Sequence, residues 1–423
     1  MAFPVMEVVL GSLISLYLVE TYLALRQHAA LKLPMLPVTL QGVISPEKFK
    51  KSRAYMIDKS HFRIVHEAAT MLMDSMILLY RIIPWLWKRS GSFVEYVGLD
   101  AENETLHSIS FFVAVLVSSQ IFELPFSLYS NFVIEAQHDF NKQTKRVFFK
   151  NLSIELCISS LFGAPIVAAI ISIVQRGGNY LVIYLWGFSF VVSVTLTIVY
   201  PLLIAPLFNN FTALPDGELR KEIENLASSL NFPLENIFMM DGSTRSTHSN
   251  AYMYGVFNKS IVLDDTLIKQ CQDTDKVVAV IAHEMGHWKL NHTIHAFAAI
   301  QVLLFVHFGV FDIVRQSSVL FQNFGFDTQP ILIGFFIFQH VVMPIQHIFS
   351  FCMNLISRSS EFKADVFAKN IGYGTALQAA LVKLQEQNLS AVNTDPWYSA
   401  YHYSHPPLAE RVAALDELNK KSA

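Results

Sequence analysis

Three residues near the middle of the chain have the types and spacing of a metal-dependent hydrolase. His283, Glu284 and His287 form the pattern H-E-x-x-H within VVAVIAHEMGHWKL. Residues four apart lie one above the other on a helix, so two imidazoles can bind one Zn²⁺ from a single element. Glu284 adjoins a ligand, where its carboxylate can take a proton from zinc-bound water, whose pKa the metal lowers to about 7. The sequence therefore predicts a zinc site with Glu284 as general base.

A third ligand must come from elsewhere in the chain. The longer pattern H-E-x-x-H-x-x-G-x-x-H is absent, because leucine and threonine stand where its glycine and third histidine belong, and His292 and His295 have the wrong spacing. A glutamate from a second helix is the other common solution. SRSSEFKADVFA offers Glu361 with Asp365 four residues later. We expect Glu361 to bind the metal and Asp365 to accept a hydrogen bond from a ligand histidine.

Both patterns also have a simpler interpretation. A helix can present two histidines and a glutamate to solvent without binding a metal, and an E-x-x-x-D pair is more often a solvated helix face. The residues around His283 are mostly apolar, and the small or apolar Ala364 and Ala368 lie beside the acidic pair. These neighbours favour a buried metal site.

Flanking segments predict the elements that hold these residues. Asp273 to Asp275 offer an N-cap for the helix that carries H-E-x-x-H. Upstream, residues 218–230 have the pattern of an amphipathic helix. Residues 250–255 and 260–265 alternate as two strands of a hairpin.

The composition indicates a membrane protein. Of 423 residues, 52% are hydrophobic and only 15% charged, and the mean hydropathy is +0.38, which is too apolar for a soluble protein of this size. A bilayer needs about 20 apolar residues per helix. Seven stretches qualify, near residues 5–25, 65–87, 107–129, 151–175, 179–207, 296–315 and 331–352.

Other compositional features exclude several alternatives. The net charge is −3 and no long basic run adjoins exposed aromatic residues, so we expect no nucleic-acid partner. Three scattered cysteines imply no disulfide framework. The oligomeric state is not predicted by these features.

The chain divides into four parts. Residues 1–207 are predicted to form membrane helices one to five, and residues 208–295 the catalytic segment with the H-E-x-x-H helix. Residues 296–352 form helices six and seven, and residues 353–423 the catalytic segment with the E-x-x-x-D helix. Because the two catalytic segments flank a pair of spans, we expect both on the same side of the membrane.

Ionisable residues within the apolar stretches predict a hydrated cavity. Each would cost several kcal/mol if it faced lipid, so we expect these side chains to face the interior or water. Some lie near helix ends, where they could instead extend to the membrane surface. The residues concerned are Glu20, Asp74, Glu123, Glu155, His307, Asp312, His340 and His347.

Basic residues predict the topology. They accumulate in loops one and three, as expected of the cytosolic side. This bias places the catalytic segments and the C-terminus in the cytosol and the N-terminus in the lumen. The basic residues of the two loops are Arg26, Lys32, Lys48, Lys50, Lys51, Arg53, Lys59, Arg63, Lys142, Lys145, Arg146 and Lys150.

Taken together, HEMGHWKLNH, SRSSEFKAD, YHYSHPPLAER and STHSNAYMYG, with about seven spans, resemble the type I CAAX prenyl proteases over essentially the whole chain. The resemblance implies about seven transmembrane helices enclosing a chamber, joined to a gluzincin-like α+β zinc protease domain. It also implies an integral-membrane zinc metalloendopeptidase that removes the three residues beyond a prenylated cysteine. Family members occupy the endoplasmic reticulum membrane, and some the inner nuclear envelope.

The resemblance assigns further site residues. His405 matches a histidine near the metal that could stabilise the oxyanion, and Arg411 matches a supporting arginine that we expect to bind substrate. Asn250, Ala251 and Tyr252 match a strand that pairs with the extended substrate. Without the resemblance, His405 would equally be a surface histidine before a Pro-Pro turn, and the strand an ordinary edge strand.

Two other functions share some of these features. Bacterial heat-shock membrane proteases, which act in quality control, have the same two zinc motifs, but they are shorter and have fewer spans. A scaffold that has lost catalysis would not be expected to retain Glu284 and a complete ligand set. We therefore expect a prenyl-protein endopeptidase.

Overall fold

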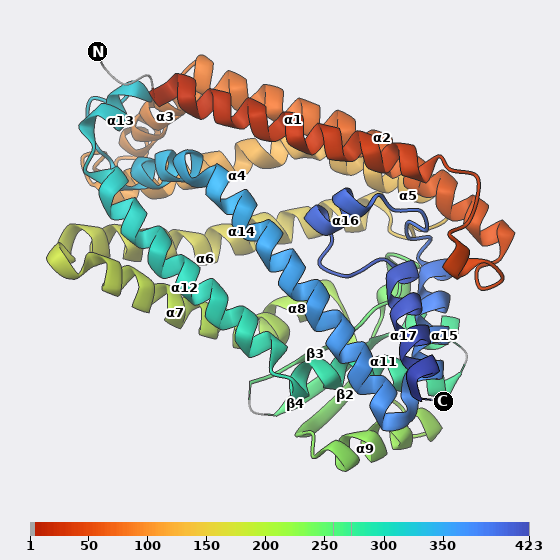
Figure 1. The fold of residues 1–423 in the computed structure, drawn as a ribbon. Coiled ribbons are helices and arrows are strands. Elements are labelled where there is room, and N and C mark those ends of the chain that lie inside the picture. The colour runs from red at the N-terminus through yellow and green to blue at the C-terminus, as the bar shows by residue number, and fades with distance from the viewer. Residues whose placement is uncertain (1–4, 257, 272, 423) are drawn as a thin grey trace.

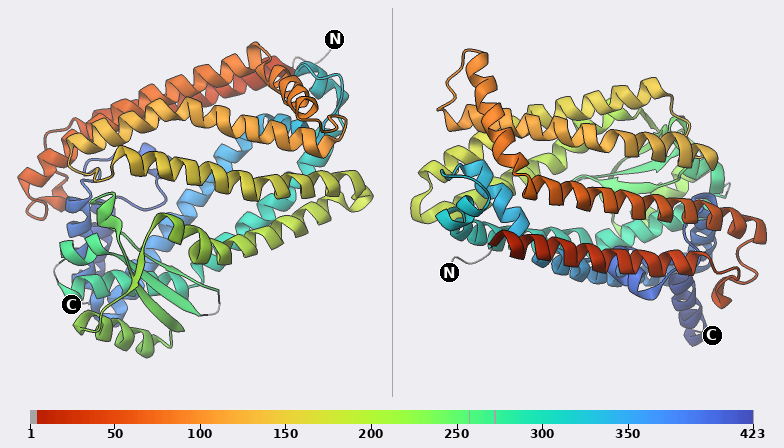
Figure 2. Two further views of the ribbon diagram at one scale, coloured as in Figure 1. Left: turned by 180° about the vertical axis from the view of Figure 1, so that it is seen from behind. Right: turned by 90° about the horizontal axis from the view of Figure 1, so that it is seen from above.

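The computed structural model describes residues 5–256, 258–271 and 273–422. Long helices form an extended array, and a small sheet with its covering helices lies at one end of it (Figure 1). Figure 2 shows the same array from behind and from above, with the N-terminus at the end remote from the sheet. The architecture thus has a helical membrane region and a compact α+β region.

Six helical segments of the described chain are long and apolar enough to cross a membrane. The predicted first, third, fourth, fifth, sixth and seventh spans all fall within them. Their main helices are α1 Val5–Leu31, α4 Glu104–Tyr129, α6 Lys145–Arg176, α7 Leu181–Val199, α12 His292–Arg315 and α14 Ile331–Ala368.

The predicted second span differs from expectation because it is broken. Residues 65–87 belong to α2 Pro46–Leu79 and α3 Ile82–Tyr96, which are bent by 70° relative to each other. Arg81 at the break has a φ of 51°. Pro84 lies in the first turn of α3, where the missing N–H needs no helical partner, so a new helix can begin there. The membrane helices number seven if this pair is one span.

The membrane helices form an open array. In the most apolar windows of the segments containing α4 and α7, only 6% of the residues are buried. Several ionisable side chains pair across the array, as Glu20 does with His402 at 3.1 Å and Glu123 with His66 at 3.0 Å. Such pairs agree with polar side chains facing the interior rather than lipid.

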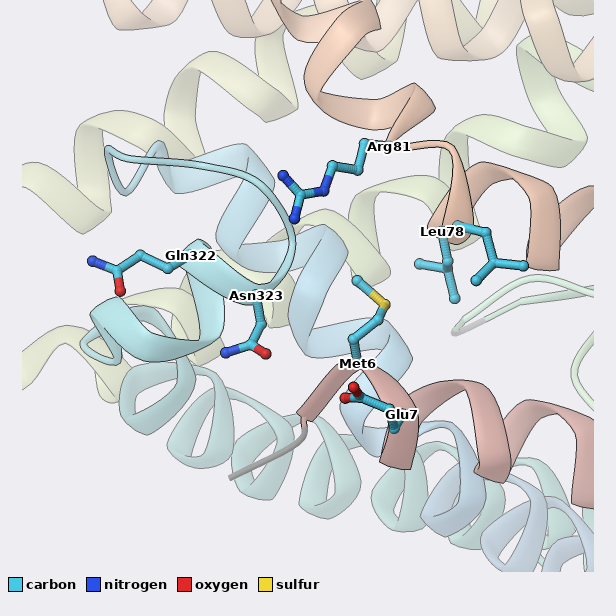
Figure 3. A pocket seen from close by; sticks show the side chains of 7 residues that line it. Met6, Glu7, Leu78, Arg81, Gln322 and Asn323 are labelled. Atoms are coloured by element: carbon cyan, nitrogen blue, oxygen red, sulfur yellow. The ribbon is translucent and has the colours of Figure 1, made fainter. Parts of the chain in front are cut away.

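A cavity of about 430 Å³ lies at the end of the array remote from the sheet (Figure 3). It includes none of the predicted site residues. Its lining combines one acidic and one basic side chain with amides and apolar groups, namely Met6, Glu7, Leu78, Leu79, Arg81, Gln322 and Asn323.

A four-stranded sheet with the order β1-β2-β4-β3 supports the catalytic region. Its strands are β1 Phe211–Ala213, β2 Leu234–Met240, β3 Ala251–Tyr254 and β4 Lys259–Asp264. The pair β3–β4 is antiparallel, with Ala251 opposite Leu263, which confirms the predicted hairpin. Residue 257 of its turn lies outside the described chain. Because β3 is last in the order, one of its edges has no partner strand within the described part of the chain.

Helices pack on this sheet and carry the metal-binding motifs. The predicted amphipathic helix is α9 Glu218–Leu230, and α11 Thr274–Lys289 carries H-E-x-x-H. The carboxylate of Asp273 accepts a hydrogen bond from the Asp275 N–H at 3.1 Å and caps α11, as predicted. Buried side chains of α11 form one core with the sheet, α9 and α15 Gly374–Gln387.

The helix α14 brings the second motif to the first. It packs against α11, and a Cβ at Gly286 would lie 3.0 Å from the Phe367 ring, so glycine allows this close approach. The same helix crosses the predicted boundary at residue 352 without interruption, and the four-part division of the chain stays a prediction. After α15, α16 Pro396–His402 and α17 Leu408–Ser422 complete the chain.

Candidate metal centre

The three predicted ligands lie together at the contact of α11 and α14. The Nε2 atoms of His283 and His287 are 3.2 Å apart. Glu361 places Oε1 3.2 Å from Nε2 of His287 and Oε2 3.4 Å from Nε2 of His283. The three ligand atoms all lie within 4.8 Å of one another. Two side chains four apart on one helix and a carboxylate from the next helix therefore converge on one point.

This arrangement fits a bound cation. Nδ1 of His283 donates to the Asp365 carboxylate, so its Nε2 directs a lone pair into the centre, and the same holds for His287 when its Nδ1 donates to Nδ1 of His292. Oε2 of Glu361 is buried, and among the described residues its contacts with Arg411 at 3.3 Å and His283 at 3.4 Å lack hydrogen-bond geometry. Electron-rich atoms this close are unfavourable unless a cation lies between them. Two histidines and a glutamate are also a donor set of catalytic zinc peptidases.

Asp365 lies behind the ligands, where we expected a partner for a ligand histidine, and Arg411, which we expected to bind substrate, lies beside it. Oδ1 of Asp365 lies 2.9 Å from Nδ1 of His283, which fixes the tautomer that leaves Nε2 free for metal. Arg411 donates from Nε to Oδ2 of Asp365 at 2.8 Å, and its second amino group lies 3.3 Å from Oε2 of Glu361. Burial lowers the pKa of Arg411, but the carboxylates of Asp365 and Glu361 raise it by more than burial lowers it. The net pKa lies above its ordinary value, so the guanidinium stays charged. Arg411 thus orients both carboxylates.

His292, which its spacing excludes as the third ligand, is nevertheless a neighbour of the metal centre. Nδ1 of His292, in the first turn of α12, lies 3.0 Å from Nδ1 of His287. Spacing along the chain excludes His292 as the third ligand of the extended motif, and the structure does not change this exclusion. Its contact depends on the tight turn between α11 and α12, where Asn291 adopts a φ of 57°. The start of a new helix only five residues after His287 was the feature of the sequence that could have indicated this contact.

Glu284 lies beside the ligands on α11 and is suited to accept a proton. Removal from bulk water raises the pKa of its carboxyl group, and Glu361 adds to the increase, while His283 and His287 oppose it. A carboxylate with a raised pKa is a better general base near neutral pH.

His405 reaches the centre from the loop between α16 and α17. Its Nε2 lies 3.3 Å from Oε1 of Glu361, and its Nδ1 lies 3.0 Å from Oγ of Ser404. The side chain is 67% exposed, so it borders the site from the open side. An imidazole in this position can donate a hydrogen bond to a bound carbonyl oxygen.

The open edge of β3 borders the same site. The Asn250 carbonyl accepts from the Asp264 N–H at 3.1 Å and therefore faces β4. Backbone groups alternate along a strand, so those of Ala251 and Met253 face the open edge, whereas those of Tyr252 face β4. The Asn250 side chain accepts from the Ala251 N–H at 2.9 Å. Within the predicted strand from Asn250 to Tyr254, the carbonyl of Ala251 and the backbone groups of Met253 can pair with a further strand, whereas the Ala251 N–H is bonded to Asn250.

Comparisons with known proteins agree with this geometry. Residues 26–210 match the family CAAX prenyl protease N-terminal, five membrane helices, and residues 213–419 match peptidase family M48. The CAAX prenyl protease 1 homolog of Arabidopsis thaliana is 62% identical over all of both chains. CAAX prenyl protease 1 of Saccharomyces cerevisiae is 36% identical, with 98% of this chain and 96% of the relative covered.

A solved structure shares the whole fold. The crystal structure of S. mikatae Ste24p superimposes with a TM-score of 0.93 at 36% identity, covering 98% of this chain and all of the other. The likeness confirms the predicted architecture of membrane helices enclosing a chamber, joined to a small α+β protease domain. The chain is therefore a multi-pass membrane protein of the CAAX prenyl protease 1 family, within peptidase family M48.

Proposed function

We propose that this protein is a zinc metalloendopeptidase that removes the C-terminal tripeptide of prenylated CAAX proteins. The observation that carries the proposal is the convergence of His283, His287 and Glu361 beside Glu284 and the open edge of β3. The names of its relatives, CAAX prenyl protease 1, support the substrate class.

The site residues have separate roles in this reaction. Bound Zn²⁺ would supply the positive charge that acidifies water and polarises the scissile carbonyl. Glu284 takes a proton from the attacking water and passes it to the amine of the leaving tripeptide. The oxygen of the water bonds to the carbonyl carbon as the C–N bond breaks. His405 donates a hydrogen bond to the carbonyl oxygen as negative charge develops there, and Ala251 aligns the substrate backbone.

The supporting residues keep this arrangement fixed. Asp365 holds His283 in the required tautomer, and Arg411 binds Asp365 and Glu361 from the buried side. A charged guanidinium there also offsets the two carboxylates in a site with little water. We assign Arg411 to this support rather than to direct contact with substrate, because its side chain is buried behind the ligands.

Location in a membrane suits an enzyme that acts on prenylated proteins. A prenyl chain partitions into a bilayer, so a multi-pass enzyme can meet its substrate where the lipid anchor resides. We place the catalytic segments and the C-terminus on the cytosolic side of the endoplasmic reticulum membrane, with the inner nuclear envelope as a second site. The excess of basic residues in loops one and three supports this orientation.

Digestion of a farnesylated peptide ending in C-a-a-X tests the proposal. Purified full-length protein should release the tripeptide, cut the unprenylated twin much more slowly, and stop when a zinc chelator removes the metal. Elemental analysis of the same sample should give one zinc per chain. Equal cleavage of unfolded, unprenylated protein would instead support the quality-control function of the bacterial heat-shock type.

A further inference from the structure

A cavity of about 690 Å³ begins at His405 and extends past the N-terminal end of β3. Its volume lies in the range of roughly 300–1,000 Å³ that is typical of ligand pockets. Most of the lining side chains carry hydrogen-bonding groups. They include Lys59 of α2, His248 to Asn250 before β3, Asn388 after α15, and the segment His402–Leu408.

Asn388 ends the pairing edge of β3 at this cavity. Its Oδ1 accepts from the Ser249 N–H at 3.0 Å, and its Nδ2 donates to the Ser249 carbonyl at 3.3 Å. Ser249 is two residues before Ala251, so these are the backbone groups that would otherwise continue the open edge. A substrate strand can therefore pair with Ala251 and Met253 but must leave the strand at Ser249.

The cavity fixes the direction of the substrate. Cleavage of a CAAX protein leaves three residues on one side of the scissile bond and a whole protein on the other. The cavity volume is suited to the short side, so we expect the C-terminal end to point from Ala251 towards His248, antiparallel to β3. Three extended residues span about 10 Å. Beyond Ala251 the substrate leaves the strand, and the cavity lined by Asn250, His248 and Lys59 offers room for these residues.

Lys59 lies at the end of this path. Its Nζ donates to the hydroxyl of Tyr55 at 3.1 Å and lies 3.3 Å from Oε1 of Glu135. Glu135 is also held by Tyr55 at 2.7 Å and lies 3.5 Å from His248, so its charge is shared among several donors. An ammonium group has three N–H donors, and the contacts recorded for the described chain use two. The third can bind an anionic group in the cavity.

His248 links this cation to the strand. Its ring stacks on Phe140 with centroids 4.1 Å apart and an interplanar angle of 9°. Its Nε2 lies 3.5 Å from both the Tyr55 hydroxyl and a Glu135 oxygen, which are the two partners of Lys59. The ammonium group is therefore held next to the residue where the third position of the leaving tripeptide would lie.

We propose that this cavity binds the C-terminal tripeptide of the substrate and that Lys59 binds its terminal carboxylate. The inference rests on the proposed function and adds the feature by which the enzyme recognises a chain end. Because the leaving tripeptide would occupy this cavity, the prenylated cysteine on the other side of the scissile bond would lie towards the other end of β3.

Peptides that differ only at their C-terminus test this assignment. The unaltered protein in detergent should cleave a farnesylated C-a-a-X peptide with a free carboxylate at least about tenfold more efficiently, by kcat/KM, than the same peptide with a C-terminal amide. Lys59→Gln should lose this preference by slowing cleavage of the carboxylate peptide, while cleavage of the amide stays nearly unchanged. Lys50→Gln, on an exposed part of α2 outside the cavity, should keep it.

Binding gives a second measurement that does not need turnover. In a Glu284→Ala background, the carboxylate peptide should bind about tenfold more tightly than the amide, and adding Lys59→Gln should make the two equal. Equal handling of both peptides by the protein with Lys59 intact would overturn the carboxylate assignment, as would a preference that survives Lys59→Gln. Failure of the unaltered protein to cut either peptide would overturn the proposed function itself.

Discussion

Nδ1 of His287 lies 3.0 Å from Nδ1 of His292, whereas the corresponding atom of His283 faces the carboxylate of Asp365 at 2.9 Å. The two histidine ligands thus have different partners at Nδ1, an imidazole for His287 and a carboxylate for His283. Because an acceptor at Nδ1 fixes the ring and raises its basicity, the two ligands depend on two separate supporting residues.

Removal of the imidazole partner should weaken the metal site. We expect His292→Ala to lower zinc affinity about 10–100-fold, the usual effect of losing such a partner. Competition with a chelator measures this directly. His292→Asn, whose side-chain oxygen can accept the same hydrogen bond, should recover part of the affinity, and His295→Ala, exposed on the same helix, should have no effect. A His292→Ala protein with unchanged affinity would show that the contact is incidental.

Substitution of Glu284 should separate metal binding from catalysis. Glu284→Ala removes a proton acceptor and no ligand, so we expect the zinc content to stay near one per chain while peptide cleavage is lost. Zinc and turnover can be measured on one preparation. Metal that disappears together with activity would contradict the assignment and indicate a structural or ligand role.

Substitution of Glu361 should give the opposite pattern. Two imidazoles alone make a poor zinc site, so Glu361→Ala should lose most of its metal on dialysis and its activity with it. The Glu284→Ala protein is the matched control, because it removes a carboxylate from the same centre without removing a ligand. Full zinc occupancy in Glu361→Ala would require a different third ligand.

Asp264 should make the stability of the protein depend on pH. Burial raises the pKa of its carboxyl group to about 6, with Asp265 adding to the increase while the Asn250 N–H and Arg245 oppose it. Because the ordinary value is 3.8, the unfolded chain ionises first, and stability falls as pH rises from about 4 to 6. Asp264→Asn removes this penalty and should stabilise the protein at pH 8 by up to about 3 kcal/mol, with little gain near pH 4.

Thermal unfolding in detergent at the two pH values measures this difference. Asp216→Asn is a suitable control, because the Asp216 side chain is 96% exposed and its ion pair with Arg220 should contribute little. An equal gain for Asp264→Asn at both pH values would mean that ionisation is not its cause.

Glycosylation reports the topology. Only lumenal sequons receive sugar, so we expect Asn103, in the loop before α4, to be the one candidate for modification. The remaining sequons should stay bare, at Asn151, Asn210, Asn258, Asn291 and Asn388. Mobility shifts after glycosidase treatment, with each asparagine changed in turn to glutamine, identify any modified site. Sugar on Asn210, Asn258 or Asn388 would place the catalytic region in the lumen.

Local patterns predicted the elements of the catalytic region well. The cap at Asp273, the hairpin after Asn250 and the helix carrying Glu361 each depend on residues close together in sequence. The family resemblance then supplied His405 and Arg411, which spacing alone could not assign.

The remaining features depend on tertiary contacts. The bend between α2 and α3 was missed because residues 65–87 are apolar through much of their length, and a straight helix and a bent pair of helices share this pattern. His292 and Asn388 were missed because their partners, His287 and Ser249, become neighbours only after a tight turn in one case and distant packing in the other. A single sequence shows no pattern for such contacts.

The continuity of α14 ties the chemistry to the bilayer. Its 38 residues extend roughly 57 Å, whereas the hydrocarbon core is about 30 Å thick. The helix that contains the predicted seventh span, which begins at Ile331, therefore also carries Glu361 without an intervening loop, so the metal centre is rigidly connected to that span. A lipid-anchored substrate resides in the bilayer, so under the proposed function this continuous helix couples the position of the metal centre to the membrane that holds the substrate.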